Sequence, residues 1–363
     1  MRFALTCIAA ATLLAACSRP AEVAPPKAAA AAQPAPAAAP HDAGIAWKYA
    51  TSDADVNAAF ASAKADNKPV FVYWGAKWCP PCNQVKATLF NRQDFIERSR
   101  AFVPVYVDGD TPGAQKIGAR FKVSGYPTMV LFNPQGIELT RLPGEVDAAQ
   151  YTQVLTLGMN AQRPVKEVLR LALGETRVAG AGGSPSAGPS QAGLVPSGDR
   201  PRYTGGEGSS LTANDWKLLA FYSWETDEKQ LVAADAVPAL LKQLADACPA
   251  DQAETASRLR LKALAAVDEK AEAAPDAASR TKVLALLADP VQSRAHMDVL
   301  TNAAPEITRA LTAAKTPERG QLLAAMNSAL ERLENDATLS RADRMTALVA
   351  QVELARIDAG KDA

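Results

Sequence analysis

Two cysteines in the run Trp78-Cys79-Pro80-Pro81-Cys82 have a spacing that suits redox chemistry. The apolar run Pro69 to Tyr73 precedes them and predicts a strand buried on both faces. Residues Pro80 to about Phe90 are expected to form a helix that begins beside the cysteines. The sulfur of Cys79 would then face unpaired backbone N–H groups and the positive end of the helix dipole, which favour thiolate over thiol.

The thiolate is the nucleophile in thiol–disulfide exchange, and a second cysteine one helical turn away can resolve a mixed disulfide. We therefore expect Cys79 to be exposed and to attack, and Cys82 to be shielded and to resolve. Trp78 is expected beside the site, where it shields the sulfurs and meets the substrate. Lys77 can support the thiolate by its charge, but a solvated surface lysine with little influence is an equally good interpretation.

Other uses of this cysteine pair fit the sequence less well. A structural zinc site needs about four ligands, and beyond this pair the chain from residue 17 onward has only Cys17, Cys248, His41 and His296 as cysteines and histidines. Haem attachment requires a histidine directly after the second cysteine, and Asn83 stands there. A structural disulfide that closes so small a loop would contribute little stability. Redox work is favoured, with no metal and no cofactor expected.

The segment 45–175 alternates between helix and strand signals. The helix that starts at Ser52 or Asp53 places four apolar residues on one face: Val56, Ala59, Phe60 and Ala63. Further helices are expected over Asp94–Arg100, Gly113–Phe121, Asp147–Met159 and Val165–Leu173, and strands over Phe102–Val107, Thr128–Phe132 and Ile137–Arg141. Pro104 is unusual inside a strand, because proline has no N–H to donate to a neighbouring strand. The alternation, with one hairpin, predicts an α/β fold whose mixed central sheet is covered by helices on both faces.

The cysteine run after an apolar strand resembles the active site of the thioredoxin superfamily. A second signature of that superfamily is a cis proline that opens a strand about forty residues later, and Gly125-Tyr126-Pro127-Thr128 matches it. The resemblance implies that Pro127 lies against the cysteine pair, prevents metal binding and offers backbone to the substrate. Trp78, Tyr126 and Pro127 are accordingly the expected substrate-binding residues. The resemblance covers roughly residues 50–160 and implies a thioredoxin-like fold there.

Within the superfamily, Asn91 to Asp108 is similar to the branch that includes the periplasmic domains of the transmembrane disulfide reductase. The chain also departs from the family pattern. Tyr73 stands where thioredoxins carry a buried acid for proton transfer, so the group that activates Cys82 is unidentified. Pro80 and Pro81 replace the usual intervening pair and bring neither an N–H nor a histidine. These departures predict a thiolate of ordinary stability and a reducing potential.

The first 17 residues carry an export signal. Arg2 is followed by an almost wholly apolar stretch up to Ala16, which predicts a signal peptide too short to span a bilayer as a stable anchor. Leu14-Ala15-Ala16-Cys17 resembles the lipobox of bacterial lipoproteins, which implies that Cys17 is acylated after cleavage. An ordinary cleavage site with a chance cysteine is the alternative. Ser18 in place of an aspartate favours the outer membrane among lipoproteins of enteric bacteria.

Two low-complexity stretches divide the rest of the chain. Residues 18–44 consist mostly of alanine and proline and predict a disordered tether, and residues 176–209 are rich in Gly, Ser and Pro and predict a flexible linker. We therefore expect a thioredoxin-like domain over 45–175 and a separate all-helical domain over 210–363.

Prolines recur along the helical segment and tend to end or start helices, which predicts about seven or eight short antiparallel helices. The prolines concerned are Pro238, Pro249, Pro275, Pro290 and Pro305. Near the C-terminus, Thr316-Pro317-Glu318 is expected to start a helix with a core-facing stripe of Leu322, Met326, Leu330 and Leu333. Ser340 is expected to cap the next helix with Asp343, and Met345, Leu348, Val349 and Val352 follow. Cys248 is expected to be a small buried apolar residue.

Basic and acidic residues balance at 39 each, so the composition indicates no nucleic-acid partner. The leading hypothesis is an exported enzyme of the periplasm that reduces or isomerises disulfides through Cys79 and Cys82. Its expected partners are disulfide-containing exported proteins, an inner-membrane thiol electron donor and, through the lipid anchor, a membrane. The alternative is an envelope scaffold that acts through its helical segment, with the thioredoxin unit ancillary.

Overall fold

The structure is a computed structural model, and it describes residues 44–123, 125–142, 148–174, 211–224, 227, 231–267, 277–312 and 318–358. The predicted signal peptide, the lipidation site Cys17, the linker 176–209 and all of the tether except Gly44 lie outside the described residues. The predicted helix start at Thr316 and Pro317, and the predicted break at Pro275, also lie outside them.

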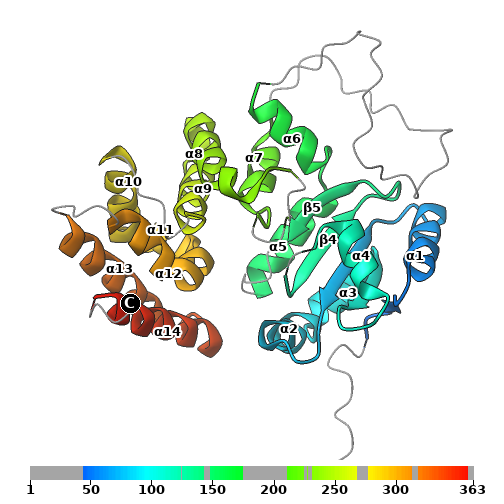
Figure 1. Cartoon of the computed structure of the whole chain (residues 1–363). Coiled ribbons are helices and arrows are strands. Elements are labelled where there is room, and N and C mark those ends of the chain that lie inside the picture. The colour runs from blue at the N-terminus through cyan, green and yellow to red at the C-terminus, as the bar shows by residue number, and fades with distance from the viewer. Residues whose placement is uncertain are drawn as a thin grey trace, which may run out of the picture. The chain divides into compact units, whose positions relative to one another are not determined.

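A five-stranded mixed sheet forms the centre of the first folded region (Figure 1). Its strands are β1 (Lys48–Tyr49), β2 (Val70–Gly75), β3 (Val103–Asp108), β4 (Thr128–Phe132) and β5 (Glu138–Leu142). The spatial order is β1-β3-β2-β4-β5, in which β1, β3 and β2 run parallel and β4 and β5 run antiparallel to their neighbours. The predicted mixed sheet with one hairpin is confirmed.

Helices cover both faces of this sheet, as predicted. The helices are α1 (Asp53–Ala65), α2 (Pro80–Val85), α3 (Gln93–Ser99), α4 (Ala114–Phe121), α5 (Ala148–Met159) and α6 (Val165–Ala172). Phe60 of α1 and Ile117 of α4 belong to the cluster on one face, and Phe95 of α3 and Tyr151 of α5 belong to the cluster on the other. The helix predicted to end near Phe90 changes to π-helical geometry at Lys86, in the segment η1 (Lys86–Phe90).

Local sequence signals account for the start of α1 and for the tolerated proline in β3. Ser52 caps α1 in a capping box with Asp55, so two otherwise unpaired backbone N–H groups are satisfied. The Val103 N–H donates to the carbonyl of Pro69 on the side of β2. Because the backbone groups of successive residues in a strand point to opposite neighbours, the backbone nitrogen of Pro104 faces the side of β1. Because β1 pairs only with Val105 and Tyr106, Pro104 costs the sheet no ladder hydrogen bond.

Eight α-helices lie among the described residues from 211 to 358, which agrees with the predicted helical segment. They are α7 (Ala213–Ala220), α8 (Val237–Ala247), α9 (Ala253–Ala265), α10 (Ala277–Ala288), α11 (Pro290–Ala295), α12 (Met297–Thr312), α13 (Arg319–Glu334) and α14 (Arg341–Asp358), with short 3-10 turns η2 (Ala234–Ala236) and η3 (Ala250–Gln252). The break predicted at Pro305 is present as a kink within α12. The backbone leaves helical geometry at Ala303, and Pro305 lies at the start of the helical segment that follows.

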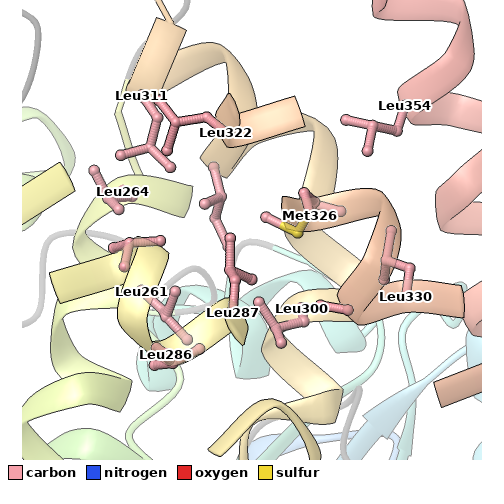
Figure 2. Close-up of a cluster of buried hydrophobic side chains, with 14 of the residues drawn as sticks. Leu261, Leu264, Leu286, Leu287, Leu300, Leu311, Leu322, Met326, Leu330 and Leu354 are labelled. Atoms are coloured by element: carbon pink, nitrogen blue, oxygen red, sulfur yellow. The ribbon is translucent and has the colours of Figure 1, made fainter. Parts of the chain in front are cut away.

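The last helices bury a leucine-rich cluster, part of which Figure 2 shows. The predicted stripe of α13 is confirmed, because all four of its residues are buried. In α14 the large apolar side chains do not face the core: Met345 is 48% exposed and Val349 is 52% exposed. Ala347, Ala350 and Leu354 face the core instead, since small residues let this helix approach α12 and α13 closely.

The two sides of the predicted linker share one hydrophobic cluster. Val168 and Leu169 of α6 pack with Trp216 and Leu219 of α7, and the cluster continues into α8 and α9. Arg163, just before α6, forms an ion pair with Asp215 of α7 at 3.0 Å.

A second link between the regions lies at strand β5. The Ser223 N–H donates to the carbonyl of Arg141, whose side chain is fully buried, pairs with Glu138 and donates to the carbonyl of Lys122. The helical region therefore packs on the sheet domain through both apolar and polar contacts.

A buried polar group lies inside the helical region. Arg258 of α9 and Asp298 of α12 form an ion pair, and both side chains are almost fully buried. His296, at the end of α11, is 1% exposed, and neither ring nitrogen has a hydrogen-bond partner among the described residues. In the described part of the chain, no helix combines the length and the apolar character that crossing a membrane requires.

Candidate active site

The cysteine pair lies where strand β2 passes into helix α2. β2 ends at Gly75, and Cys79 is the N-cap residue of α2. A disulfide joins Cys79 to Cys82, with 5.2 Å between their Cα atoms. The structure thus brings the two predicted catalytic residues together at the start of the helix, as the sequence indicated.

The backbone offers the sulfur of Cys79 one amide from the first turn of α2. Pro80 and Pro81 occupy the first two helical positions and have no N–H, while the Cys82 N–H donates to Cys79 Sγ at 3.1 Å. An N–H that points at this sulfur stabilises a thiolate there. One amide supports a thiolate less than several would.

The expectation that Cys79 is exposed is wrong for the disulfide form. Cys79 is 2% exposed and Cys82 is 0% exposed. Both cysteines pack with Ala76 and with the side chain of Tyr126, which comes from a loop distant in sequence. A thiol that attacks Cys79 Sγ in this disulfide form therefore needs a local rearrangement of the side chains that cover it.

The loop before β4 carries the second predicted signature. The peptide bond between Tyr126 and Pro127 is cis. Thr128 pairs with Trp74, so the antiparallel register places Pro127 next to the end of β2, where the cysteine loop begins. The structure thereby brings Tyr126 and Pro127 to the same edge of the sheet as the cysteines.

Aromatic side chains surround Tyr126. The Trp74 ring stacks against it with centroids 5.9 Å apart, and Trp78 meets it edge-on at 5.7 Å. Trp78 is 65% exposed. Burial raises the pKa of Tyr126, and the charges of Asp110 and Asp108 raise it further, so its hydroxyl stays protonated at neutral pH.

Three features of the site were missed in the sequence. Trp74 belongs to the core and also stacks its ring against that of Tyr126. Asn83 ties the cysteine loop to α2 by donating from its side-chain amide to the Lys77 carbonyl at 3.0 Å, whereas the Lys77 side chain is exposed. Tyr73 lies under α2, with its hydroxyl 3.5 Å from the Cys82 carbonyl oxygen. The sequence signal for the position of Tyr73 was Gly75. This glycine follows two positions later on the same face of β2 and leaves room for the tyrosine ring.

The remaining cysteine of the described region lies apart from this site. Cys248 is half-buried at the end of α8, and burial raises the pKa of its thiol to about 11. The expectation of a fully buried thiol is therefore only partly met. Within the described ranges, no three side chains of His, Cys, Asp or Glu cluster as metal ligands would.

Comparisons with known proteins agree on the segment that carries the site. Residues 56–158 match the family model described as a thioredoxin-like domain. A thiol:disulfide interchange protein of Pseudomonas fluorescens is 30% identical over 106 residues, which is 28% of this chain and 18% of the relative. A thioredoxin-like protein of Synechocystis is 32% identical over 88 residues, which is 24% of this chain and 79% of the relative. The solution structure of a thioredoxin from Thermus thermophilus is 28% identical, with 32% of this chain and 90% of that chain covered and a TM-score of 0.27.

A mixed sheet flanked by helices, with a disulfide at the start of α2 and a cis proline beside it, defines the class of thioredoxin-like thiol–disulfide oxidoreductases. The chain belongs to the thioredoxin-like family through its residues 56–158. It spans about a fifth of the length of the thiol:disulfide interchange proteins that it matches.

Proposed function

We propose that this chain is an exported enzyme, anchored by lipid at Cys17, that reduces or isomerises disulfides in envelope proteins. The observation that carries the proposal is the Cys79–Cys82 disulfide at the N-cap of α2, packed under Tyr126 of the cis-proline loop. The relatives named as thiol:disulfide interchange proteins support the same chemistry.

The reaction starts from the reduced pair. The Cys79 thiolate attacks one sulfur of a substrate disulfide, the substrate S–S bond breaks, and the first substrate thiolate leaves and takes a proton from water. Cys82 then loses its proton to water and attacks Cys79 Sγ. The Cys79–Cys82 bond forms, the mixed disulfide breaks, and the second substrate thiolate leaves. Two electrons have passed from the dithiol to the substrate, and a thiol donor must return two to the chain.

The reducing direction is supported by the surroundings of Cys79. With Pro80 and Pro81 at the first helical positions, only the Cys82 N–H is seen to reach the sulfur. A weakly stabilised thiolate gives a dithiol that is a better reductant, because strong oxidants owe their potential to a stabilised reduced form. The proposed electron donor is an inner-membrane thiol protein, the proposed location is the periplasmic side of a bacterial membrane, and the outer membrane is favoured.

An insulin reduction assay tests the activity. The wild-type chain and a Cys248→Ala control should both reduce insulin, and Cys79→Ala should be inactive. A Cys82→Ala variant should accumulate mixed disulfides with its substrates, because the resolving thiol is missing. Equal activity in the wild type and Cys79→Ala would contradict the proposal.

The alternative is a partner-binding role for the helical region. It is favoured by the large apolar side chains that α14 exposes, Met345, Leu348, Val349 and Val352. If the wild-type chain reduces no disulfide under any donor condition, this alternative replaces the enzymatic one.

A further inference from the structure

Tyr73 is the polar side chain that contacts the resolving cysteine from the interior of the sheet. It comes from the centre of β2, where all six residues are buried, and is itself 0% exposed. Its hydroxyl points at the carbonyl oxygen of Cys82 across 3.5 Å. This distance is long for an O–H···O hydrogen bond, so the contact is weak in the disulfide form.

The position of the phenol ring depends on the glycine that ends β2. A Cβ atom at Gly75 would lie 2.5 Å from the Tyr73 hydroxyl and 2.6 Å from the neighbouring ring carbons. Phe90 of the π-helical segment η1 packs edge-on against the same ring, with centroids 5.0 Å apart, and Tyr106 packs at 5.1 Å. Gly75 therefore leaves the space that the ring fills, and its aromatic neighbours hold the hydroxyl under α2.

The surroundings of Tyr73 contain no buried carboxyl group. Among the described residues from 44 to 174, the buried polar side chains are Ser99, Thr128, Asn133, Thr140 and Arg141. A phenol titrates near pH 10 in water, and burial disfavours its anion. A phenol hydroxyl can orient a partner by donating its hydrogen, whereas a carboxylate would also accept the proton that Cys82 must lose.

We propose that Tyr73 is a positioning residue for Cys82, and this inference rests on the proposed dithiol chemistry. Its hydroxyl donates to the Cys82 carbonyl and fixes the first turn of α2, so that Cys82 Sγ faces Cys79 Sγ. During resolution the Cys82 S–H proton passes to water. The new S–S bond forms as the bond from Cys79 to the substrate sulfur breaks, and the departing thiolate takes a proton from water.

This assignment predicts how the resolution rate depends on pH. Because the proton leaves to water, the rate of resolution should rise tenfold per pH unit and level off at the pKa of Cys82. A single inflection is expected. A neutral hydrogen bond contributes about 0.5–1.5 kcal/mol, and the length of this contact points to the lower end, which corresponds to roughly a twofold to threefold effect.

The test compares Tyr73→Phe with Tyr151→Phe, both in a Cys248→Ala background. Tyr151 is an equally buried tyrosine of the same cluster, but its hydroxyl contacts Met129 Sδ at 2.8 Å. The measurements are the rate at which a preformed glutathione mixed disulfide at Cys79 closes, by acid quench across pH, and the dithiol equilibrium with glutathione.

Tyr73→Phe should lower the plateau rate about twofold to threefold and shift the glutathione equilibrium by a similar factor, with the single inflection kept. Tyr151→Phe should change neither quantity, although both variants lose a buried hydroxyl. Identical plateau rates and equilibria in all three proteins would overturn the positioning role. A second inflection in the wild type that Tyr73→Phe removes would also overturn it, because the phenol would then be accepting the proton.

Gly75→Ala provides an independent variant, since the added methyl displaces the Tyr73 hydroxyl. It should slow closure at least as much as Tyr73→Phe, and a closure rate equal to that of the wild type would count against the inference. Both measurements use glutathione alone, so they report on Tyr73 even if no protein substrate is reduced. Failure of the insulin assay with normal closure kinetics would refute the proposed function and leave the role of Tyr73 intact.

Discussion

The buried histidine of the helical region should make this chain sensitive to mild acid. His296 is 1% exposed, and neither ring nitrogen has a hydrogen-bond partner among the described residues. The pKa of its imidazole is lowered from 6.5 to about 4, mainly by burial. The cation of Arg258 contributes to this lowering, and the carboxylate of Asp298 opposes it. Protonation therefore costs more in the folded chain than in the unfolded chain.

The sign and size of the effect follow from proton linkage. Between pH 6.5 and pH 4 the unfolded chain binds a proton at His296 that the folded chain does not, so stability falls as the pH falls. The stabilisation is complete above pH 6.5. With pKa values of 6.5 and about 4, the free energy of unfolding should drop by about 2 kcal/mol between pH 7 and pH 5.

The assay is urea denaturation at pH 7 and at pH 5, followed by far-ultraviolet circular dichroism. The perturbation is His296→Leu, which removes the titrating group. The quantity compared between the two proteins is the change in the free energy of unfolding from pH 7 to pH 5. The variant should lose about 2 kcal/mol less than the wild type on acidification. The matched control is His41→Leu, because the chain has only two histidines, and it should behave as the wild type does. Equal losses in the wild type and His296→Leu would refute the reasoning.

Other predictions concern packing, capping and thiol reactivity. Leu330 is fully buried in the cluster of Figure 2, and Leu330→Ala should lower the free energy of unfolding by about 2–5 kcal/mol. Val349 is 52% exposed, and Val349→Ala should change the free energy of unfolding by less than about 0.5 kcal/mol in the same urea titration. Ser52→Ala removes the N-cap of α1 and should cost about 1 kcal/mol, and a cost near zero would mean that solvent replaces the cap. The pKa of Cys248 is raised to about 11, so about one part in a thousand of this thiol should be thiolate at pH 8. Iodoacetamide should therefore label Cys248 far more slowly in the folded chain than in urea, which mass spectrometry can measure.

The order and type of the elements in the first region could be predicted because their signals are local. The cap at Ser52, the buried run of β2 and the turn between β4 and β5 each depend on a few neighbouring residues. The cysteine pair at the start of α2 was found for the same reason, since strand, cysteine and helix signals follow one another along the chain.

Features that depend on distant residues could not be predicted. Cys79 is covered by Tyr126, which lies far along the chain, and no local pattern contains that contact. The fully buried Arg141 is compensated by Glu138 and by carbonyls of the α4 end, so its burial is a tertiary property. In α14 the apolar stripe was visible, but the sequence does not say that Ala347 and Ala350 give the closer approach to neighbouring helices.

The packing of α6 against α7 has a consequence for how the chain can be divided. Val168 and Leu169 share a cluster with Trp216 and Leu219, and Arg163 pairs with Asp215 across the same contact. These contacts should therefore hold α6 against α7 even when the chain is cut within residues 175–210. A chain cut once within that stretch should elute from a sizing column as a single species, and the two halves, produced as separate polypeptides, should reassemble into one complex.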